Sequence, residues 1–125
     1  MIERITFLGH ATLLIETGGA RLITDPVLRS RLVHLRRHGR AVDEDVQRDL
    51  DGILISHLHR DHWDTPSLKL LERWTPIVVP RGAGALAADA GFTDVREVAA
   101  GESVELSGVR VRAVHADHDD RRGPV

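Results

Sequence analysis

The hydrophobic positions at the start of the chain alternate with polar ones, which is the pattern of β-strands. Residues 2–8 and 11–17 show this alternation, and a shorter run follows at 20–25. Because a strand with one buried face carries an apolar side chain at every second position, we interpret all three runs as strands. Gly18-Gly19 lies between the second and third runs and predicts a hairpin turn. Asp25-Pro26 then ends the third strand, since proline has no N–H for the ladder.

The middle of the chain begins with a stretch that has no regular period. Residues 27–50 are rich in arginine and too long for a plain connection. We therefore expect a functional loop there, or a loop that contains a short helix. Residues 51–56, with the sequence DGILIS, form a short apolar run between polar neighbours and predict a buried strand. Several histidines begin where this strand stops.

A helix is predicted after the histidines. Thr65-Pro66 has the residue types of an N-cap and a first helical position, and Leu68, Leu71 and Trp74 follow at the spacing of one helix face. A second helix is expected at 84–91, closed by Gly91 at the C′ position. The remaining apolar runs predict strands at 76–80, 95–98, 103–106 and 109–114. Hairpins mixed with β-helix-β units indicate the α+β class.

Composition narrows the classes of function. The 125 residues fit a single domain over 1–125, and a net charge of -2 argues against a general nucleic-acid or membrane surface. The absence of cysteine excludes disulfides, thiolate metal sites and cysteine nucleophiles, and it fits a reducing compartment. Glu3 and Arg4 stand where an export signal needs apolar residues. No apolar run is long enough to span a bilayer, so we expect a cytoplasmic protein.

The strongest chemical signal is the stretch SHLHRDHWD at 56–64. It places His57, His59, Asp61 and His62 within six positions, which chance would produce about once in a million starting positions. Imidazole and carboxylate are preferred ligands of Zn²⁺, Mn²⁺ and Fe. A turn leaving a strand end can direct two of these side chains to one point and two to an adjacent point, which suits metals about 3.5–4 Å apart. The alternatives are a solvated polar loop or a structural metal site.

This motif after a hydrophobic strand resembles the signature of the metallo-β-lactamase fold superfamily. The opening ITFLGHATLLIETGGARLITDPVL is similar to that of the branch containing ascorbate-6-phosphate lactonases and N-acylphosphatidylethanolamine phospholipases D. GESVELSGVRVRAVHADH resembles the approach of that branch to its next metal histidine. The resemblance implies an αβ/βα sandwich, of which this chain is about the N-terminal half. It also implies a mixed, mostly antiparallel sheet with helices on one face.

The resemblance further implies a role for each ligand. His57, His59 and His118 would bind the first metal, and Asp61 and His62 the second. Asp61 would also lie near the attacking water as the catalytic residue. The cofactor would be Zn²⁺, with Mn²⁺ or Fe as alternatives, and a complete site would hold up to two ions.

Other residues are weaker candidates. His115 is the alternative third ligand of the first metal. Asp25 is either a turn residue or a carboxylate that orients a ligand histidine, and the resemblance favours the second role. His10 follows a strand end, where it would line the same pocket or cap a turn. His34 and His38 lie among arginines, and we interpret them as solvated.

The chain has no counterpart of the family's bridging aspartate or of its final histidine. We therefore expect a metal-dependent hydrolase, or the metal-binding half of one, that uses metal-activated water on a phosphodiester, lactone or other ester. The alternative is a non-catalytic metal-binding or assembly module. The expected partners are a small-molecule substrate and, across a bare sheet face, a second copy of the chain or a missing second half. No nucleic-acid partner is expected.

Overall fold

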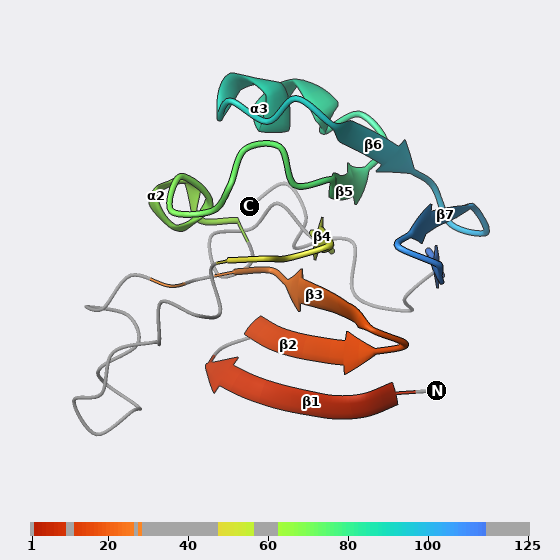
Figure 1. Ribbon diagram of the computed structural model, residues 1–125. Helices are drawn as coiled ribbons and strands as arrows, with labels where there is room; N and C mark the ends of the chain where they lie inside the picture. Colours follow the sequence, from red (N-terminus) through yellow and green to blue (C-terminus); the bar gives the residue numbers. More distant parts are fainter. Residues whose placement is uncertain (1, 10–11, 27, 29–47, 57–62, 115–125) are drawn as a thin grey trace.

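Six strands form one mixed sheet in the computed structural model, which describes residues 2–9, 12–26, 28, 48–56 and 63–114. The order in the sheet follows the order in the sequence, and Figure 1 shows the strands rising from β1 at the bottom. These strands are β1 (Ile2–Gly9), β2 (Thr12–Thr17), β3 (Ala20–Thr24), β4 (Gly52–Leu54), β5 (Ile77–Pro80) and β6 (Val95–Val98). A separate hairpin consists of β7 (Ser103–Leu106) and β8 (Val109–Arg112), and the described helices are α2 (Thr65–Leu68) and α3 (Gly84–Asp89).

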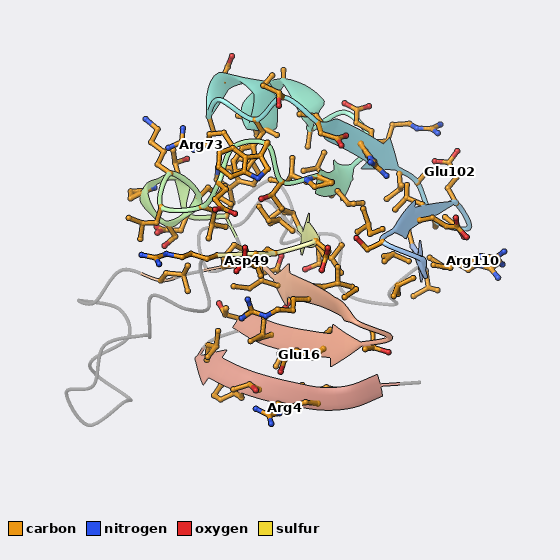
Figure 2. All side chains as sticks on the ribbon, in the orientation of Figure 1. Arg4, Glu16, Asp49, Arg73, Glu102 and Arg110 are labelled. Carbon is orange, nitrogen blue, oxygen red and sulfur yellow. The ribbon has the colours of Figure 1, made fainter. Side chains whose placement is uncertain are left out.

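The first three strands form the antiparallel meander that the alternating pattern predicts. β1 pairs with β2 and β2 with β3, both antiparallel. Gly18 and Gly19 have φ values of 56° and 83°, which a tight hairpin turn with right-handed strand twist requires. Figure 2 shows Arg4 and Glu16 on neighbouring strands, with Arg4 Nε 3.7 Å from Glu16 Oε1. The predicted hairpin is confirmed.

The second part of the sheet is parallel, and this corrects the expectation of a mostly antiparallel sheet. β3 pairs with β4, β4 with β5 and β5 with β6, all parallel. For the last two pairs the reason lies in the connections, because α2 and α3 each carry the chain back across the sheet before the next strand. The mixed sheet itself was predicted correctly. At its parallel end the carboxyl ends of β3, β4 and β5 meet along one edge.

Both helices cover the same side of the sheet, as predicted. The main core contains Leu68 of α2 and Ala87 of α3, packed with Ile53 and Ile77 of the central strands. Consecutive right-handed crossovers place successive helices on one face, which explains the arrangement. The predicted end of α3 is also confirmed, since Gly91 follows the helix with φ 102°.

Arg73 joins the ends of the two helices. Its Nη2 donates to the Lys69 carbonyl at 2.6 Å and its Nη1 to the Ala90 carbonyl at 3.0 Å. Lys69 and Ala90 are the C-cap residues of α2 and α3, and Figure 2 shows Arg73 beside these helices. A cation at two helix C-termini is electrostatically favourable.

The other side of the sheet is covered in part by the β7–β8 hairpin. Leu106 of β7 is 2% exposed and packs with Leu22 and Val78. On the β1 part of the sheet, however, Ile5 is 52% and Phe7 is 59% exposed. Register places a row of side chains on this side, across five strands: Phe7, Leu13, Thr24, Leu54 and Val78.

The helix predicted from Thr65 differs in two details. Its N-cap is Asp64, one residue earlier, and the helix ends at Leu68. Because the helix is so short, Trp74 does not share a helix face with Leu68, and it is 68% exposed although Leu71 is buried. The sequence prediction for Thr65 and Trp74 was therefore wrong. Asp is as good an N-cap as Thr, and the periodicity did not distinguish them.

Two other sequence predictions concern the arginine-rich stretch and membrane-spanning segments. Most of the arginine-rich stretch 27–50 lies outside the described residues, so its predicted loop or short helix stays a prediction. Among the described helices, none has the length and apolar character needed to cross a membrane.

Candidate functional site

Four of the five candidate ligands occupy the gap between two described flanks, and the fifth follows the last described residue. His57, His59, Asp61 and His62, and also His118, lie outside the described residues. The same holds for His10 and His115. The described chain reaches Ser56 on one side of the motif and resumes at Trp63 on the other. The structure therefore tests how the fold presents the two ends of the motif.

The first flank leaves the centre of the sheet. β4 lies between β3 and β5, and Ile53 is fully buried. Ile55 N donates to the Val78 carbonyl at 2.9 Å, which holds the chain against β5 beyond the end of β4. Ser56 follows at the carboxyl edge of the parallel strands. This edge is where open sheets with parallel strands bind ligands, so the motif begins at a favourable place.

Asp25 fastens Ser56 from the neighbouring strand end. Its Oδ1 accepts the Ser56 N–H at 2.7 Å and its Oδ2 accepts the Ser56 hydroxyl at 2.6 Å. Asp25 is 4% exposed and has φ 39°, a left-handed conformation that costs energy for most residues and that Asp tolerates better. The Thr12 hydroxyl donates to the Asp25 carbonyl at 2.8 Å. A buried carboxylate thus fixes the residue directly before His57.

The predicted role of Asp25 stays a prediction, and the described contact with Ser56 stands beside it. The expectation was a carboxylate that orients a ligand histidine, and the candidate histidines lie outside the described residues. The contact described is with Ser56, on both its backbone and its side chain. Asp25 therefore holds the residue directly before His57 by two hydrogen bonds.

The second flank is fastened by Asp64, which the sequence analysis did not single out. Asp64 is 6% exposed, and its Oδ2 accepts the Ser67 N–H at 3.1 Å and the Ser67 hydroxyl at 2.5 Å. The Ser67 hydroxyl in turn accepts the Leu28 N–H at 2.6 Å. The available signal was Asp followed three residues later by a polar residue, which is the spacing of a capping motif.

Trp63 completes the second flank. Its Nε1 donates to the Thr65 hydroxyl at 3.0 Å, and its ring packs against the main core. A half-buried Trp with a satisfied N–H anchors the chain strongly for its size. The residue directly after His62 is therefore held, as is the residue directly before His57.

A hollow of about 540 Å³ opens at the same edge, on the hairpin side of the sheet. Asp25 and Ser56 line one part of it, and Arg112 is the cationic residue in its described lining. Most of the remaining wall is apolar and comes from the strand ends and from the segment after β8: Leu54, Ile55, Val78, Pro80, Val98, Val111 and Val114. The hollow has the size of a small-molecule pocket.

The metal donors predicted from sequence are not tested by these flanks. Within residues 2–9, 12–26, 28, 48–56 and 63–114, no three His, Asp or Glu side chains gather so as to hold a metal ion. The donor set of the motif, imidazoles with a carboxylate, has the chemistry of a zinc, manganese or iron site. The ligand assignment stays a prediction that the two fastened flanks make physically reasonable.

Comparison with known proteins agrees with the motif. A family model described as a beta-lactamase superfamily domain matches residues 4–125. A UPF0173 protein of Pyrococcus furiosus is 32% identical over 98% of this chain and 52% of its own length. A UPF0173 metal-dependent hydrolase of Methanopyrus kandleri is 28% identical over 92% of this chain and 47% of its own length. An N-acyl-phosphatidylethanolamine-hydrolyzing phospholipase D of Caenorhabditis elegans is 30% identical over 94% of this chain and 38% of its own length.

Solved structures have the same fold. A possible metal-dependent hydrolase from Veillonella parvula superposes with a TM-score of 0.70 at 23% identity, over 90% of this chain and 47% of that one. CmlA, a diiron beta-hydroxylase from Streptomyces venezuelae, superposes with a TM-score of 0.67 at 25% identity, over 89% of this chain and 23% of that one. The chain spans about half the length of the first curated relatives that it matches.

Proposed function

Since the chain belongs to the metallo-β-lactamase superfamily, we propose that it is a metal-dependent hydrolase or the metal-binding half of one. The observation that carries this proposal is the pair of fastened flanks around the motif. Asp25 holds Ser56, and Asp64 holds Ser67, at the carboxyl edge of the parallel strands. Two buried carboxylates on either side of six residues are a costly arrangement for a segment that is only solvated.

The proposed ligands are those that the resemblance implies. His57, His59 and His118 hold a first metal, and Asp61 and His62 hold a second. Zn²⁺ is our first choice, with Mn²⁺ or Fe as alternatives. A relative named as a metal-dependent hydrolase supports a metal in general, and the likeness to a diiron enzyme keeps iron among the candidates.

The proposed chemistry is the attack of water on a phosphodiester, lactone or other ester. A metal ion in this site supplies Lewis acidity, which activates water and stabilises developing negative charge. The residues of the chain fix the geometry: Asp25 and Asp64 hold the main chain on both sides of the ligands. Asp61 would hold the second metal and orient the attacking water. Ligands held in place before the reaction lower the cost of reorganisation during it.

The hollow supports a small-molecule substrate. Its volume of about 540 Å³ and its apolar wall are typical of ligand pockets. Arg112 offers a positive charge to an anionic group such as a phosphodiester. The relative from Caenorhabditis elegans is named as a phospholipase D that hydrolyses N-acyl-phosphatidylethanolamine, which supports an ester of phosphate as the substrate class. A cytoplasmic location is proposed from the absence of cysteine.

The alternative proposal is a metal-binding or assembly module without turnover. The second metal has two proposed protein ligands, Asp61 and His62, and the sequence contains no counterpart of the bridging aspartate. We therefore expect this chain alone to be a poor catalyst, because loss of a ligand or its support costs about 10–100-fold in affinity or activity.

A nitrophenyl diester assay with added Mn²⁺ or Zn²⁺, together with metal stoichiometry, tests the function. Weak turnover that disappears in Asp61→Ala, with two metals per chain, is the result expected of the enzyme. One metal per chain without turnover favours the module. Robust turnover that depends on Asp61 contradicts the expectation of a poor catalyst, and means that another copy completes the site.

We also propose that the exposed part of the sheet takes part in association, with a second copy or a missing second half. Ile5 and Phe7 stand exposed on edge strand β1, and burying apolar area gains roughly 25 cal/mol per Å². Light scattering over a range of concentrations is expected to show an oligomer that Phe7→Lys weakens. A clean monomer at high micromolar concentration contradicts self-association.

A further inference from the structure

Ser67 is a junction between two segments that are distant in the sequence. Its side chain is completely buried. The hydroxyl donates to Asp64 Oδ2 at 2.5 Å and accepts the Leu28 N–H at 2.6 Å. Leu28, which is also buried, precedes Ser67 by 39 residues. One oxygen atom therefore connects the start of α2 to the segment that follows β3.

Helix capping alone does not account for this contact. Asp64 caps α2 by accepting the Ser67 N–H, and that bond needs a backbone donor only. An alanine at position 67 would leave the cap bond in place. The hydroxyl adds a bond to Asp64 and supplies the acceptor for Leu28 N, so its contribution lies in the connection between segments.

The segment reached by this hydroxyl is the one that holds the other flank. Asp25 lies three residues before Leu28 and accepts both polar hydrogens of Ser56. Asp25, Ser56, Asp64, Ser67 and Leu28 thus form a closed circuit of hydrogen bonds and short chain segments. The six residues that carry four candidate ligands lie within the span that this circuit closes.

We propose that Ser67, through Asp64 and Leu28, is a positioning residue that sets the separation of the two ends of the motif and thereby the affinity of the metal site. This proposal rests on the proposed metal-binding function. If the circuit opens at Ser67, the two flanks keep their shared hydrophobic core but lose the hydrogen-bonded link that fixes their relative position. The ligands then have more freedom to lose when a metal binds, and affinity falls.

The test is the Zn²⁺ affinity of variants, measured by competition with a chromophoric chelator. Ser67→Ala is expected to bind Zn²⁺ about 10–100-fold more weakly than the wild type. Ser67→Thr keeps the hydroxyl and is expected to retain most of the affinity. Ser107→Ala is the matched control, because its hydroxyl also donates to an aspartate, Asp51, at 2.7 Å. Its Zn²⁺ affinity is expected to equal that of the wild type.

A purely structural role would give another result. Ser67→Ala would then lower the melting temperature of the metal-free and zinc-loaded forms equally, with unchanged Zn²⁺ affinity, and this would overturn the proposal. An equal loss of affinity in Ser107→Ala would also overturn it. If Ser67→Ala does not fold, Ser67→Cys replaces it, since a thiol fills the space of the hydroxyl but is a much weaker donor and acceptor. Unchanged affinity in folded Ser67→Cys overturns the proposal, and a wild type without Zn²⁺ affinity overturns the proposed function as well.

Discussion

Two aspartates fasten opposite ends of strands β3 and β4 with similar bonds but in different surroundings. Asp25, after β3, accepts a backbone N–H and a hydroxyl from Ser56. Asp51, before β4, accepts the Arg21 N–H at 2.8 Å and the Ser107 hydroxyl at 2.7 Å. Asp25 is buried at 4% exposure, whereas the bond of Asp51 to Ser107 is exposed.

The backbone conformations and contacts at the two ends indicate different roles, one in function and one in folding. Asp51 connects β3 and the turn of the β7–β8 hairpin, and the positive φ of Ser107 belongs to that turn. The positive φ of Asp25 belongs to no hairpin turn, and its carboxylate holds the residue before the candidate ligands. Backbone strain outside turns is typical of functional sites. We therefore expect mutations at the two ends to separate stability from metal binding.

The largest expected effect comes from removing the two carboxylates in turn. Asp25→Ala leaves two partly buried donors of Ser56 without their acceptor and places Ala in a left-handed conformation, which together cost roughly 2–4 kcal/mol of unfolding free energy. Asp51→Ala is expected to cost about 1 kcal/mol, because water can replace the lost carboxylate as the acceptor for the exposed Ser107 hydroxyl. Urea unfolding measures both.

Metal binding sharpens this contrast between Asp25 and Asp51. Asp25→Asn keeps a residue that tolerates the left-handed conformation and removes one acceptor, so it tests the carboxylate with less loss of stability. We expect weaker Zn²⁺ binding in Asp25→Asn and unchanged binding in Asp51→Asn. Equal effects of the two variants on Zn²⁺ affinity would contradict a special role for the carboxyl edge.

A packing mutation at the amino end gives an intermediate effect. A Cβ on Gly52 would lie 2.5 Å from Leu106 Cδ1 and 3.0 Å from Leu22 Cδ2. Because the hairpin packs directly on this glycine, Gly52→Ala is expected to cost about 1–3 kcal/mol through overpacking. Thermal unfolding measures the loss, and Zn²⁺ affinity is expected to stay unchanged in the folded variant. A stabilised Gly52→Ala protein would show that the hairpin does not lie closely on β4.

The smallest expected effect is a pH dependence at the surface beside the hairpin. The Ala99 N–H and the Arg81 guanidinium donate to Glu102 at 2.7 and 2.6 Å, and they hold the pKa of this carboxyl below its ordinary value. A lowered folded-state pKa stabilises the protein above the ordinary pKa of 4.5, and this contribution disappears as the pH falls through the folded-state value. Figure 2 shows Glu102 next to β7.

Glu102→Gln isolates this contribution. As the pH falls into the acid range, the stability of the variant is expected to decrease slightly less than that of the wild type. Zinc binding at neutral pH is expected to stay unchanged. Melting temperatures of both proteins, measured from neutral pH down through the acid range, provide the comparison. Parallel curves would mean that the bonds to Arg81 and Ala99 contribute nothing measurable, as many surface pairs do.

The meander and the end of α3 could be predicted from sequence because their signals are local. Alternation, Gly18-Gly19 and the Gly91 helix end each depend on a few neighbouring residues. The parallel pairing of β3 with β4 could not be predicted in this way. It depends on where the chain goes between Pro26 and Leu50, and no local pattern determines that path.

The fastening of the site was only partly predictable. Asp25 was recognised as a candidate because the family resemblance favours a role for it, whereas its place before proline at a strand end also fits an ordinary turn residue. Asp64 and Ser67 were missed, since Thr65-Pro66 also looks like a helix start and the partner of Ser67 is 39 residues away. A bond of such range is determined by packing, which the sequence does not display.

The metal content of the purified protein tests the central claim most directly. Elemental analysis compares the wild type with a His57→Ala/His59→Ala double variant and with a His34→Ala/His38→Ala control of equal histidine loss. We predict that wild type and control carry Zn²⁺, Mn²⁺ or Fe, with occupancy falling below about pH 6 as imidazoles become protonated. The motif variant is predicted to lose the metal. Equal metal content in all three proteins would contradict the account.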